Sequence, residues 1–481
     1  MGRIIIIGGG FSGSAAAVHL VRRSPAALAI TIVEPRLHVG GGLAYSSDDP
    51  DHRINGQPRM HSLDPTRPGM FAAWCETNEA LAADPDALVA NGTQFMRRST
   101  YRAYLEETVS CHSAWPTGSS ITHHHDSAVD VLPEAQGWTV VTAAGARLPC
   151  AMVILACGHT RARLPRPFAA GLAQHARIIA DPLASPRLPD VPSTDRVLVL
   201  GSSLTAYDTV STLLTAGHSG PLDVVSRRGL RPRPQRPPPG PGEPPLPPML
   251  ERTAMHPEPF IHNAGPAPTV RKLLRALREE IRTQARAGNA WDHSFDHLRD
   301  MMGQLWPTLA VAEKRRFFRQ LRAWYDVHRF RVPPQNSAIV HAAEQRGQVR
   351  FRAAMIEGVE SASQDTALRI TLRERGTHTT SVEEYDRLIN CTGVDAAPLR
   401  DMPLYAALMR RGLLRVDATG VGLAVDALCR ALPDTGMPSA YLRIVGPPTA
   451  GARGDPLGTA FISLQVHRVV PDILDALDAV A

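Results

Sequence analysis

The sequence predicts an α/β protein with two parallel β-sheet domains and a helical insert. Two glycine-rich turns carry this prediction, because each follows a short apolar run and precedes a segment able to form a helix. The apolar runs cover residues 4–7 and 197–200. Such runs are typical of strands that are buried on both faces of a parallel sheet. Two strand–turn–helix units of this kind indicate two Rossmann-like domains.

The first turn has the G-x-G-x-x-G spacing of dinucleotide-binding proteins. Gly8 permits the tight turn, Gly10 lets the backbone approach a pyrophosphate, and Gly13 lets the helix pack closely on the strand. Glu34 ends the next apolar run, residues 29–33, and can accept a hydrogen bond from a ribose hydroxyl. The alternative is a glycine-rich turn in an unrelated α/β protein. The residues predicted to hold a dinucleotide here are Gly8, Gly10, Phe11, Ser12, Gly13 and Glu34.

The second turn is a relaxed version of the first, with small residues in place of the later glycines. The next strand, residues 222–225, is followed by Arg227 and Arg228. An arginine pair at this strand end suits the 2′-phosphate of NADP, whereas an acid would suit NAD. The alternative is a solvated basic turn. The residues predicted to bind this second dinucleotide are Gly201, Ser202, Ser203, Leu204, Thr205, Arg227 and Arg228.

Two segments after the second turn depart from the Rossmann pattern. Residues 231–248 are rich in proline, which excludes a regular helix or a central strand and predicts an extended surface loop. Residues 269–330 show helical periodicity, first in an amphipathic helix over 270–287. We expect these helices to form an insert beside the second domain.

Two predicted strands end in the same three-residue pattern: a small residue, then Cys or Thr, then Gly. One ending is Ala156-Cys157-Gly158 and the other is Cys391-Thr392-Gly393. We interpret them as the points where the chain leaves the first domain and returns to it. The first domain is then predicted over residues 1–190 and 353–481, and the second over 191–352.

Composition limits the classes of partner. No apolar run approaches the ~18 residues of a membrane span, and no basic stretch precedes the first strand, so we expect a cytoplasmic protein without a membrane partner. The net charge is +6, but no patch mixes basic and aromatic residues as nucleic-acid binding requires. The six cysteines form no C-x-x-C pair. His123–His125 could bind a metal, but no further ligands recur at zinc spacing, so no metal site is predicted.

Several segments together resemble a family of FAD/NAD(P)-binding flavoproteins. This family includes bacterial FAD-dependent urate hydroxylases and amino-acid N-hydroxylases that form nitrosuccinate. The segments that carry the resemblance are residues 40–46, 51–55, 97–105, 226–230, 324–329 and 389–393. The chain departs from the family at Gly201-Ser202-Ser203, where Gly-Thr-Gly is common, and at Asp455-Pro456-Leu457 before the last helix.

The resemblance implies FAD on the first turn and NADPH, or else NADH, on the second. It adds Cys157, Gly158, Cys391, Thr392, Gly393 and Gly446 to the expected FAD site. It further implies a monooxygenase that uses O₂ and a flavin C4a-hydroperoxide to hydroxylate a small, nitrogen-rich, anionic substrate, either a urate-like purine or an amino-acid amine. The alternatives are an oxidase or reductase that inserts no oxygen, and a non-catalytic flavin-binding regulatory protein.

The substrate contacts are expected on two segments. The polar segment after Gly40–Gly42 offers Arg53, Asn55, Gln57 and Arg59. The end of a predicted helix offers Tyr325 and Arg329. Arg53 could recognise an anionic substrate, or else it pairs with Asp49 or Asp51. His328 is a weak candidate for a general acid or base, and a structural, hydrogen-bonded histidine is the favoured interpretation.

Overall fold

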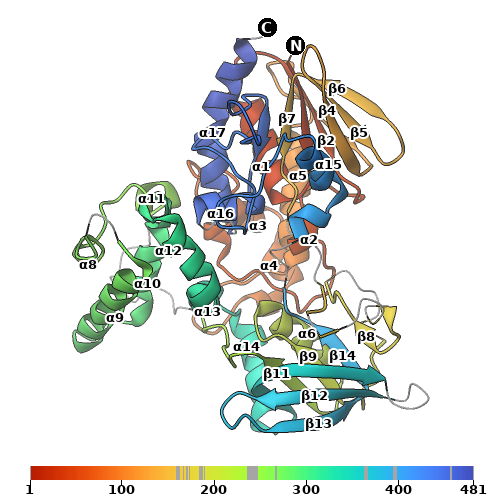
Figure 1. The fold of residues 1–481 in the computed structure, drawn as a ribbon, viewed down its shortest axis with the longest axis vertical. Helices are drawn as coiled ribbons and strands as arrows, with labels where there is room; N and C mark the ends of the chain where they lie inside the picture. Colours follow the sequence, from red (N-terminus) through yellow and green to blue (C-terminus); the bar gives the residue numbers. More distant parts are fainter. Residues whose placement is uncertain are drawn as a thin grey trace.

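The structure, a computed structural model, describes residues 2–158, 163–165, 167–168, 172, 174–183, 188, 190–235, 247–265, 268–361, 367–393, 398–454 and 458–479. Residues 236–246 of the predicted proline-rich loop and residues 455–457 therefore lie outside the described part. Two sheets stand one above the other, with a group of helices to the side of both (Figure 1).

The first sheet has five parallel strands in the order β15-β7-β1-β2-β3. Their bounds are β1 Gly2–Ile7, β2 Leu28–Val33, β3 Ser120–His124, β7 Met152–Leu155 and β15 Leu442–Ile444. The run of isoleucines in β1 is fully buried because both faces of the sheet are covered. One face packs on α1 (Phe11–Arg23), α5 (Arg98–Cys111) and the C-terminal α17 (Thr459–Asp478), which lie together in Figure 1.

The other face of the first sheet is covered by a small antiparallel sheet and one helix. The small sheet has the order β4-β5-β6, and its side chains share a core with α15 and with the odd-numbered isoleucines of β1. The bounds are β4 Ala128–Pro133, β5 Trp138–Thr142, β6 Arg147–Cys150 and α15 Pro403–Arg410. Short helices fill the connection between β2 and α5: α2 Gly42–Tyr45, α3 Met70–Thr77 and α4 Ala80–Ala83.

The second sheet has seven strands in the order β13-β12-β11-β10-β9-β14-β8. Strands β11, β10, β9, β14 and β8 run parallel, and β12 and β13 continue the sheet as an antiparallel hairpin. The bounds are β8 Ile178–Ile179, β9 Val197–Leu200, β10 Leu222–Ser226, β11 Val349–Ser361, β12 Leu368–Glu374, β13 Thr380–Tyr385 and β14 Arg387–Asn390. Helices α6 (Leu204–Thr215) and α14 (Pro334–Gln345) pack against it.

The sheet pairings move both predicted domain boundaries. Strand β8 lies before residue 190 but pairs with β14, and β11 to β14 extend past residue 353 within the second sheet. The second unit therefore runs from about β8 to Gly393, longer at both ends than the predicted 191–352. The prediction failed because strand β14 is as apolar as β7, and only the register shows which sheet an apolar strand joins.

The helical insert forms its own small core, and it packs against the first unit as well as lying beside the second, where the sequence places it. Its helices are α7 Met249–Arg252, α8 Pro259–His262, α9 Val270–Arg286, α10 Trp291–Asp300, α11 Met302–Thr308, α12 Val311–Arg316 and α13 Arg322–Arg329. Trp306 and Phe295 are buried at its centre, whereas Trp324 is 48% exposed. A short helix, α16 (Ala450–Arg453), joins the insert to the first unit through Trp306, whose indole N–H donates to the Gly451 carbonyl. Among the described helices none is both long and apolar enough to cross a membrane.

Candidate dinucleotide and substrate sites

The first glycine turn is a tight cradle at the carboxyl end of β1. Gly8 has φ +104°, and a Cβ there would lie 2.7 Å from the Ala156 carbonyl oxygen at the end of β7. A Cβ on Gly13 would collide with the Gly8 carbonyl oxygen. Gly10 caps α1, which begins at Phe11, so the free N–H groups of the first helical turn point out of the sheet edge. Glycine is thus required sterically at two of the three positions, as the spacing predicts.

Glu34 lies buried beside this cradle, at the end of β2. Its carboxylate accepts the Gly9 N–H at 2.8 Å, and it also accepts the Arg36 N–H at 3.0 Å. Burial, the two backbone donors and the Arg36 guanidinium at 3.0 Å hold the carboxylate at the sheet edge. The nearby His123 and His125 contact the backbone oxygens of Glu34 and Pro35, and His123 and His124 belong to β3.

The C-terminal part of the chain completes the first site. Gly446, directly after β15, has φ +80°, and a side chain there would collide with Ser12. The N-terminus of α17 lies close by, because Thr459 hydrogen-bonds to Tyr101, and the Tyr101 ring stacks 6.4 Å from Phe11. Two segments more than 430 residues apart in sequence therefore meet around one pocket edge.

Cys157 follows β7, and its thiol lies 3.5 Å from the Ile7 carbonyl oxygen. Burial raises the pKa of the Cys157 thiol to about 11, so at neutral pH it is an uncharged thiol and a poor nucleophile. Gly158 is exposed at the end of the described segment. These residues support the strand end rather than supply reactive chemistry.

The second glycine turn repeats the geometry of the first. Gly201 has φ +107°, and a Cβ there would collide with the Cys391 carbonyl oxygen at the end of β14. Ser203 caps α6, whose first residues are Leu204 and Thr205. The Ser202 hydroxyl donates to the Leu230 carbonyl at 2.5 Å, which ties the turn to the loop after β10. Ser203 therefore stands in place of the second glycine without loss of the helix-terminus geometry.

The twin strand endings are equivalent, but each belongs to its own glycine turn. Ala156 and Cys157 lie under Gly8, whereas Cys391 and Thr392 lie under Gly201. The assignment of Cys391, Thr392 and Gly393 to the FAD site is corrected accordingly: they form the floor of the second turn. The Thr392 hydroxyl donates to the Asn390 side chain at 2.7 Å, and Gly393 has φ +81°, which turns the chain sharply out of the sheet.

Arg227 and Arg228 lie directly beyond Ser226, the last residue of β10, beside the second turn. Arg227 is exposed and Arg228 is half-buried. Within the described part of the chain, neither guanidinium has an ion-pair partner. By contrast, the next arginine, Arg231, stacks 3.4 Å over the Phe351 ring and pairs with Glu344 at 2.8 Å. The predicted pair is therefore available to an anion, and Arg231 is not.

The structure gives Arg53 a structural partner. Its guanidinium donates to the two Asp84 oxygens at 2.8 and 3.0 Å and to the Phe95 carbonyl at 2.8 Å. Both side chains are buried. Neither predicted alternative partner is used: Asp49 instead accepts the Thr212 hydroxyl of α6 at 2.7 Å. Arg53 is thus corrected from a substrate contact to a buried ion pair.

Arg59 lies differently from Arg53, on the wall of a cavity of about 280 Å³. The cavity is bounded by the loop around Arg59 and Ser62, by Arg252 of α7, and by Ala460 and Ser463 in the first turns of α17. Arg252 is buried and paired with Asp300, but the Arg59 Nε is buried without a hydrogen-bond partner among the described residues. Arg59 is therefore the cation of this cavity that a ligand can use.

The other predicted substrate residues do not line this cavity. The Asn55 and Gln57 carbonyls accept from Gln235 and His61. Tyr325 is buried in the core of the helical insert. Arg329 is buried at the end of α13, close to the N-terminus of α17, because a Cβ on Gly458 would lie 3.3 Å from its Nη2. Sequence reasoning named Arg329 but not the helix end that it meets.

His328 is part of the packing of the insert. Its Nδ1 is hydrogen-bonded to the Trp324 carbonyl at 2.7 Å, and its ring lies 5.0 Å from Trp291 and 5.4 Å from Phe295. Burial lowers the pKa of His328, which keeps the imidazole neutral. These contacts are those of the structural, hydrogen-bonded histidine that the sequence favours over a general acid or base.

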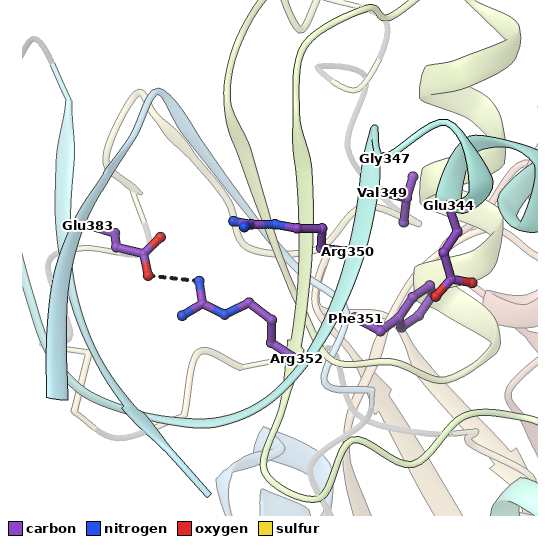
Figure 2. A pocket seen from close by; sticks show the side chains of 7 residues that line it. All are labelled: Glu344, Gly347, Val349, Arg350, Phe351, Arg352 and Glu383. Atoms are coloured by element: carbon purple, nitrogen blue, oxygen red, sulfur yellow. Dashed lines mark ion pairs between the residues drawn. The ribbon is translucent and has the colours of Figure 1, made fainter. Parts of the chain in front are cut away.

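A surface hollow beside β11 is lined by charged side chains that neutralise one another (Figure 2). Arg352 pairs with Glu383 at 2.8 Å, and Arg350 pairs with Asp223 at 2.8 Å. Glu344 is held by Arg231. Because each charged group there already has a partner, the hollow is a structural ion-pair network and not a candidate ligand site.

Comparison with known proteins agrees with this architecture. Residues 5–160, about a third of the chain, match a family model described as FAD-NAD(P)-binding, so this part of the chain is similar to FAD/NAD(P)-binding domains. No curated protein sequence matches the chain. The predicted α/β fold class with Rossmann-like parallel sheets is confirmed.

Solved structures of flavin monooxygenases share the fold over nearly the whole chain. Ornithine hydroxylase from Pseudomonas aeruginosa has a TM-score of 0.64 at 15% identity, over 99% of each chain. Ornithine N-hydroxylase from Kutzneria sp. 744, solved with reduced FAD, NADP⁺ and L-ornithine, has a TM-score of 0.61 at 15% identity, over 99% of this chain and 98% of that one. L-lysine 6-monooxygenase from Pseudomonas syringae has a TM-score of 0.59 at 15% identity, over the full length of both.

Proposed function

We propose that this protein is an FAD- and NADPH-dependent monooxygenase that N-hydroxylates a small amine bearing a carboxylate. The observation that carries the proposal is the pair of equivalent glycine turns, each closed from below by the end of a neighbouring strand. One turn has an acid beside it and the other has an arginine pair. The shared fold with ornithine and lysine hydroxylases supports the choice of an amine substrate.

FAD would be held by the first turn, with Glu34 toward its ribose and Ser12 and Gly446 beside its phosphates. Bound FAD supplies the hydride acceptor for NADPH and the centre that activates O₂. Two features of the chain favour negative charge near the N-terminus of α17: the helix dipole and the guanidinium of Arg329. NADPH would lie on the second turn, with Arg227 and Arg228 toward its 2′-phosphate.

The cavity beside α17 is the proposed substrate site. At about 280 Å³ it lies at the lower end of the range for small-molecule pockets, which suits an amino acid. The Ser463 hydroxyl is already committed to the Leu63 carbonyl at 2.6 Å, so Arg59 is the group left to receive an anion. We assign Arg59 to the substrate carboxylate, because guanidinium and carboxylate form planar, paired hydrogen bonds.

The test is a substrate panel with the purified, FAD-loaded enzyme. NADPH oxidation, O₂ uptake and hydroxylamine formation are measured with ornithine, lysine, aspartate, cadaverine and urate. The proposal expects hydroxylamine in step with O₂ uptake for an amino acid. Hydroxylation of urate instead would favour the purine alternative, and O₂ uptake that yields only hydrogen peroxide with every amine would favour an oxidase.

Arg59→Met tests the carboxylate assignment. Loss of a charge-assisted pair of roughly 1.5–3 kcal/mol should raise KM for the amino-acid substrate about 10- to 100-fold. The KM for cadaverine, which has no carboxylate, should not rise. Arg282→Met on the exposed face of α9 is the matched control, because that side chain does not line the cavity. An equal rise in both KM values would remove the assignment.

A further inference from the structure

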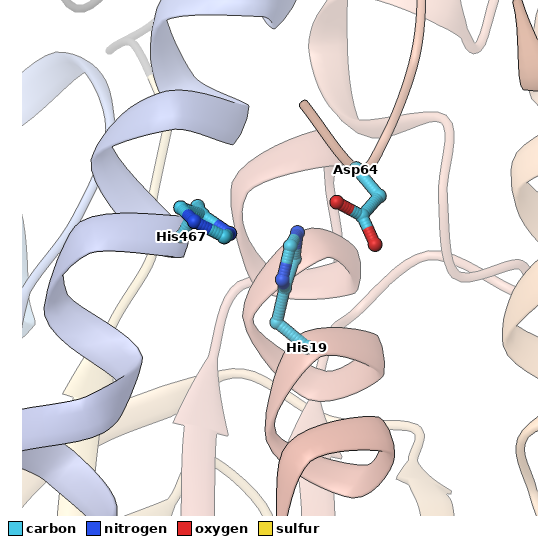
Figure 3. A group of neighbouring side chains, drawn as sticks. All are labelled: His19, Asp64 and His467. Carbon is cyan, nitrogen blue, oxygen red and sulfur yellow. The ribbon is translucent and has the colours of Figure 1, made fainter. Parts of the chain in front are cut away.

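Three side chains that offer metal-ligand atoms meet behind the cavity that Arg59 lines. His19 comes from α1, Asp64 from the loop before α3, and His467 from α17 (Figure 3). Their potential ligand atoms all lie within 4.8 Å of one another. His19 and Asp64 are buried, and His467 is half-buried. The three residues are 45 and 403 positions apart in sequence, so no local spacing could have predicted the group.

Two imidazoles and one carboxylate are side chains that bind divalent metal ions. The Nδ1 of His467 is buried and has no hydrogen-bond partner among the described residues.

We propose that His19, Asp64 and His467 form a site for one divalent transition-metal ion, for which Zn²⁺ is the best match. Two imidazoles and one carboxylate are ligands that Zn²⁺ takes at ~2.0–2.2 Å, with a fourth position left to water. Tetrahedral bonds of that length place ligand atoms roughly 3.4 Å apart. Because the ligand atoms lie within 4.8 Å of one another, binding requires the groups to approach by at most roughly 1.4 Å.

The neighbouring contacts decide how tightly the ion is held. Arg22 donates to Asp64 at 3.2 Å, and the Thr66 hydroxyl donates to the other Asp64 oxygen at 2.7 Å. The His19 Nε2 lies 3.2 Å from the Leu63 carbonyl. Arg22 competes with a cation for the same carboxylate and adds a repelling charge. The proposal therefore predicts a direction that a purely structural cluster would not show: removal of Arg22 should strengthen metal binding.

A bound ion would tie α17 to α1 and to the loop that carries Ser62. His467 lies one turn beyond Ser463, which lines the cavity. The ion would therefore brace the cavity wall from behind and would not itself touch the substrate. This role is independent of which amine the enzyme hydroxylates.

Zn²⁺ titration of the tag-free, FAD-loaded protein after EDTA treatment tests the site, with calorimetry and thermal unfolding as readouts. We expect one equivalent to bind with a rise in Tm. His467→Asn should weaken the affinity at least tenfold, Arg22→Ala should increase it, and His341→Ala, an exposed histidine on α14, should leave it unchanged. Co²⁺ in place of Zn²⁺ should give the intense visible absorption of a four-coordinate site.

Two results would overturn the proposal. One is the absence of saturable Zn²⁺ binding in both the wild-type protein and Arg22→Ala. The other is equal Zn²⁺ affinity in the wild-type protein and His467→Asn. If His467→Asn fails to fold, the Arg22→Ala comparison still decides, because that variant must gain affinity.

Discussion

Replacement of Arg53 by Met should destabilise the protein without loss of substrate affinity. Arg53 makes three hydrogen bonds of 2.8 to 3.0 Å, two to Asp84 and one to the Phe95 carbonyl. Asp84 is only 2% exposed, so the variant leaves a buried carboxylate without its main partner. Removing one partner of a buried ion pair lowers the free energy of unfolding by about 3–5 kcal/mol. Arg97 stays 3.4 Å from Asp84 and compensates in part, which places the expected loss near 3 kcal/mol.

The assay is urea unfolding followed by fluorescence, with the FAD-loaded protein and a full double-mutant cycle. Asp84→Asn removes the buried charge. The Arg53→Met/Asp84→Asn protein should therefore lose less free energy of unfolding than the sum of the losses in the two single variants. Arg282→Met, an exposed arginine without an ion pair in the described part of the chain, should change the free energy of unfolding by less than about 0.5 kcal/mol.

The contrary result is specific. If Arg53→Met unfolds like the wild-type protein while KM for the anionic substrate rises tenfold, Arg53 contacts substrate after all. In that case the pair with Asp84 would have to open when substrate binds. A loss of stability together with an unchanged KM supports the structural assignment.

Three further predictions concern the cofactors and the second sheet. Arg227→Ala/Arg228→Ala should weaken NADP⁺ about 10- to 100-fold by fluorescence titration and leave NAD⁺ nearly unchanged, and equal effects on both would remove the 2′-phosphate assignment. Gly201→Ala should abolish NADP⁺ binding and leave FAD occupancy, read from absorbance, unchanged. Gly8→Ala should lower FAD occupancy. The two effects differ because each added Cβ collides with the end of a different strand. Burial raises the pKa of Asp223, but hydrogen bonds from Arg350, Tyr385 and Arg196 lower it more, so its pKa in the folded protein lies below its ordinary value. The ionised carboxylate therefore stabilises the folded protein fully above the pKa of the unfolded chain, ~3.9, and this stabilisation is lost as the pH falls through the pKa of the folded protein. The acid limb of the unfolding free energy should therefore flatten in Asp223→Asn, and an unaltered limb would contradict this account.

Local features were readable from the sequence because short-range sterics determine them. The positions Gly8 and Gly13 follow from contacts between a turn and the helix that starts within it, and the buried strands follow from runs of β-branched residues. The sequence also indicates Gly446, through the family resemblance, and Arg329, at the end of a predicted helix. It did not identify what they meet, namely Ser12 and the N-terminus of α17.

Long-range pairings were not readable, because they depend on sheet register. The sequence shows that Cys157 and Cys391 end similar strands, but only the pairing of β14 with β9 puts Cys391 under Gly201. Arg53 shows the same limit. Asp49 and Asp51, close to it in sequence, were the expected partners, but in the folded protein Arg53 pairs with Asp84, 31 residues away.

The sequence by itself therefore determined the two glycine turns and the strand and helix that flank each of them, since these parts lie within about 30 consecutive residues. Only the tertiary structure decided which strand closes each cradle, which arginine faces a cavity, and that His19, Asp64 and His467 meet. These outcomes depend on contacts between distant segments, whose geometry is set by the packing of α17 on α1 and by strand order in the two sheets.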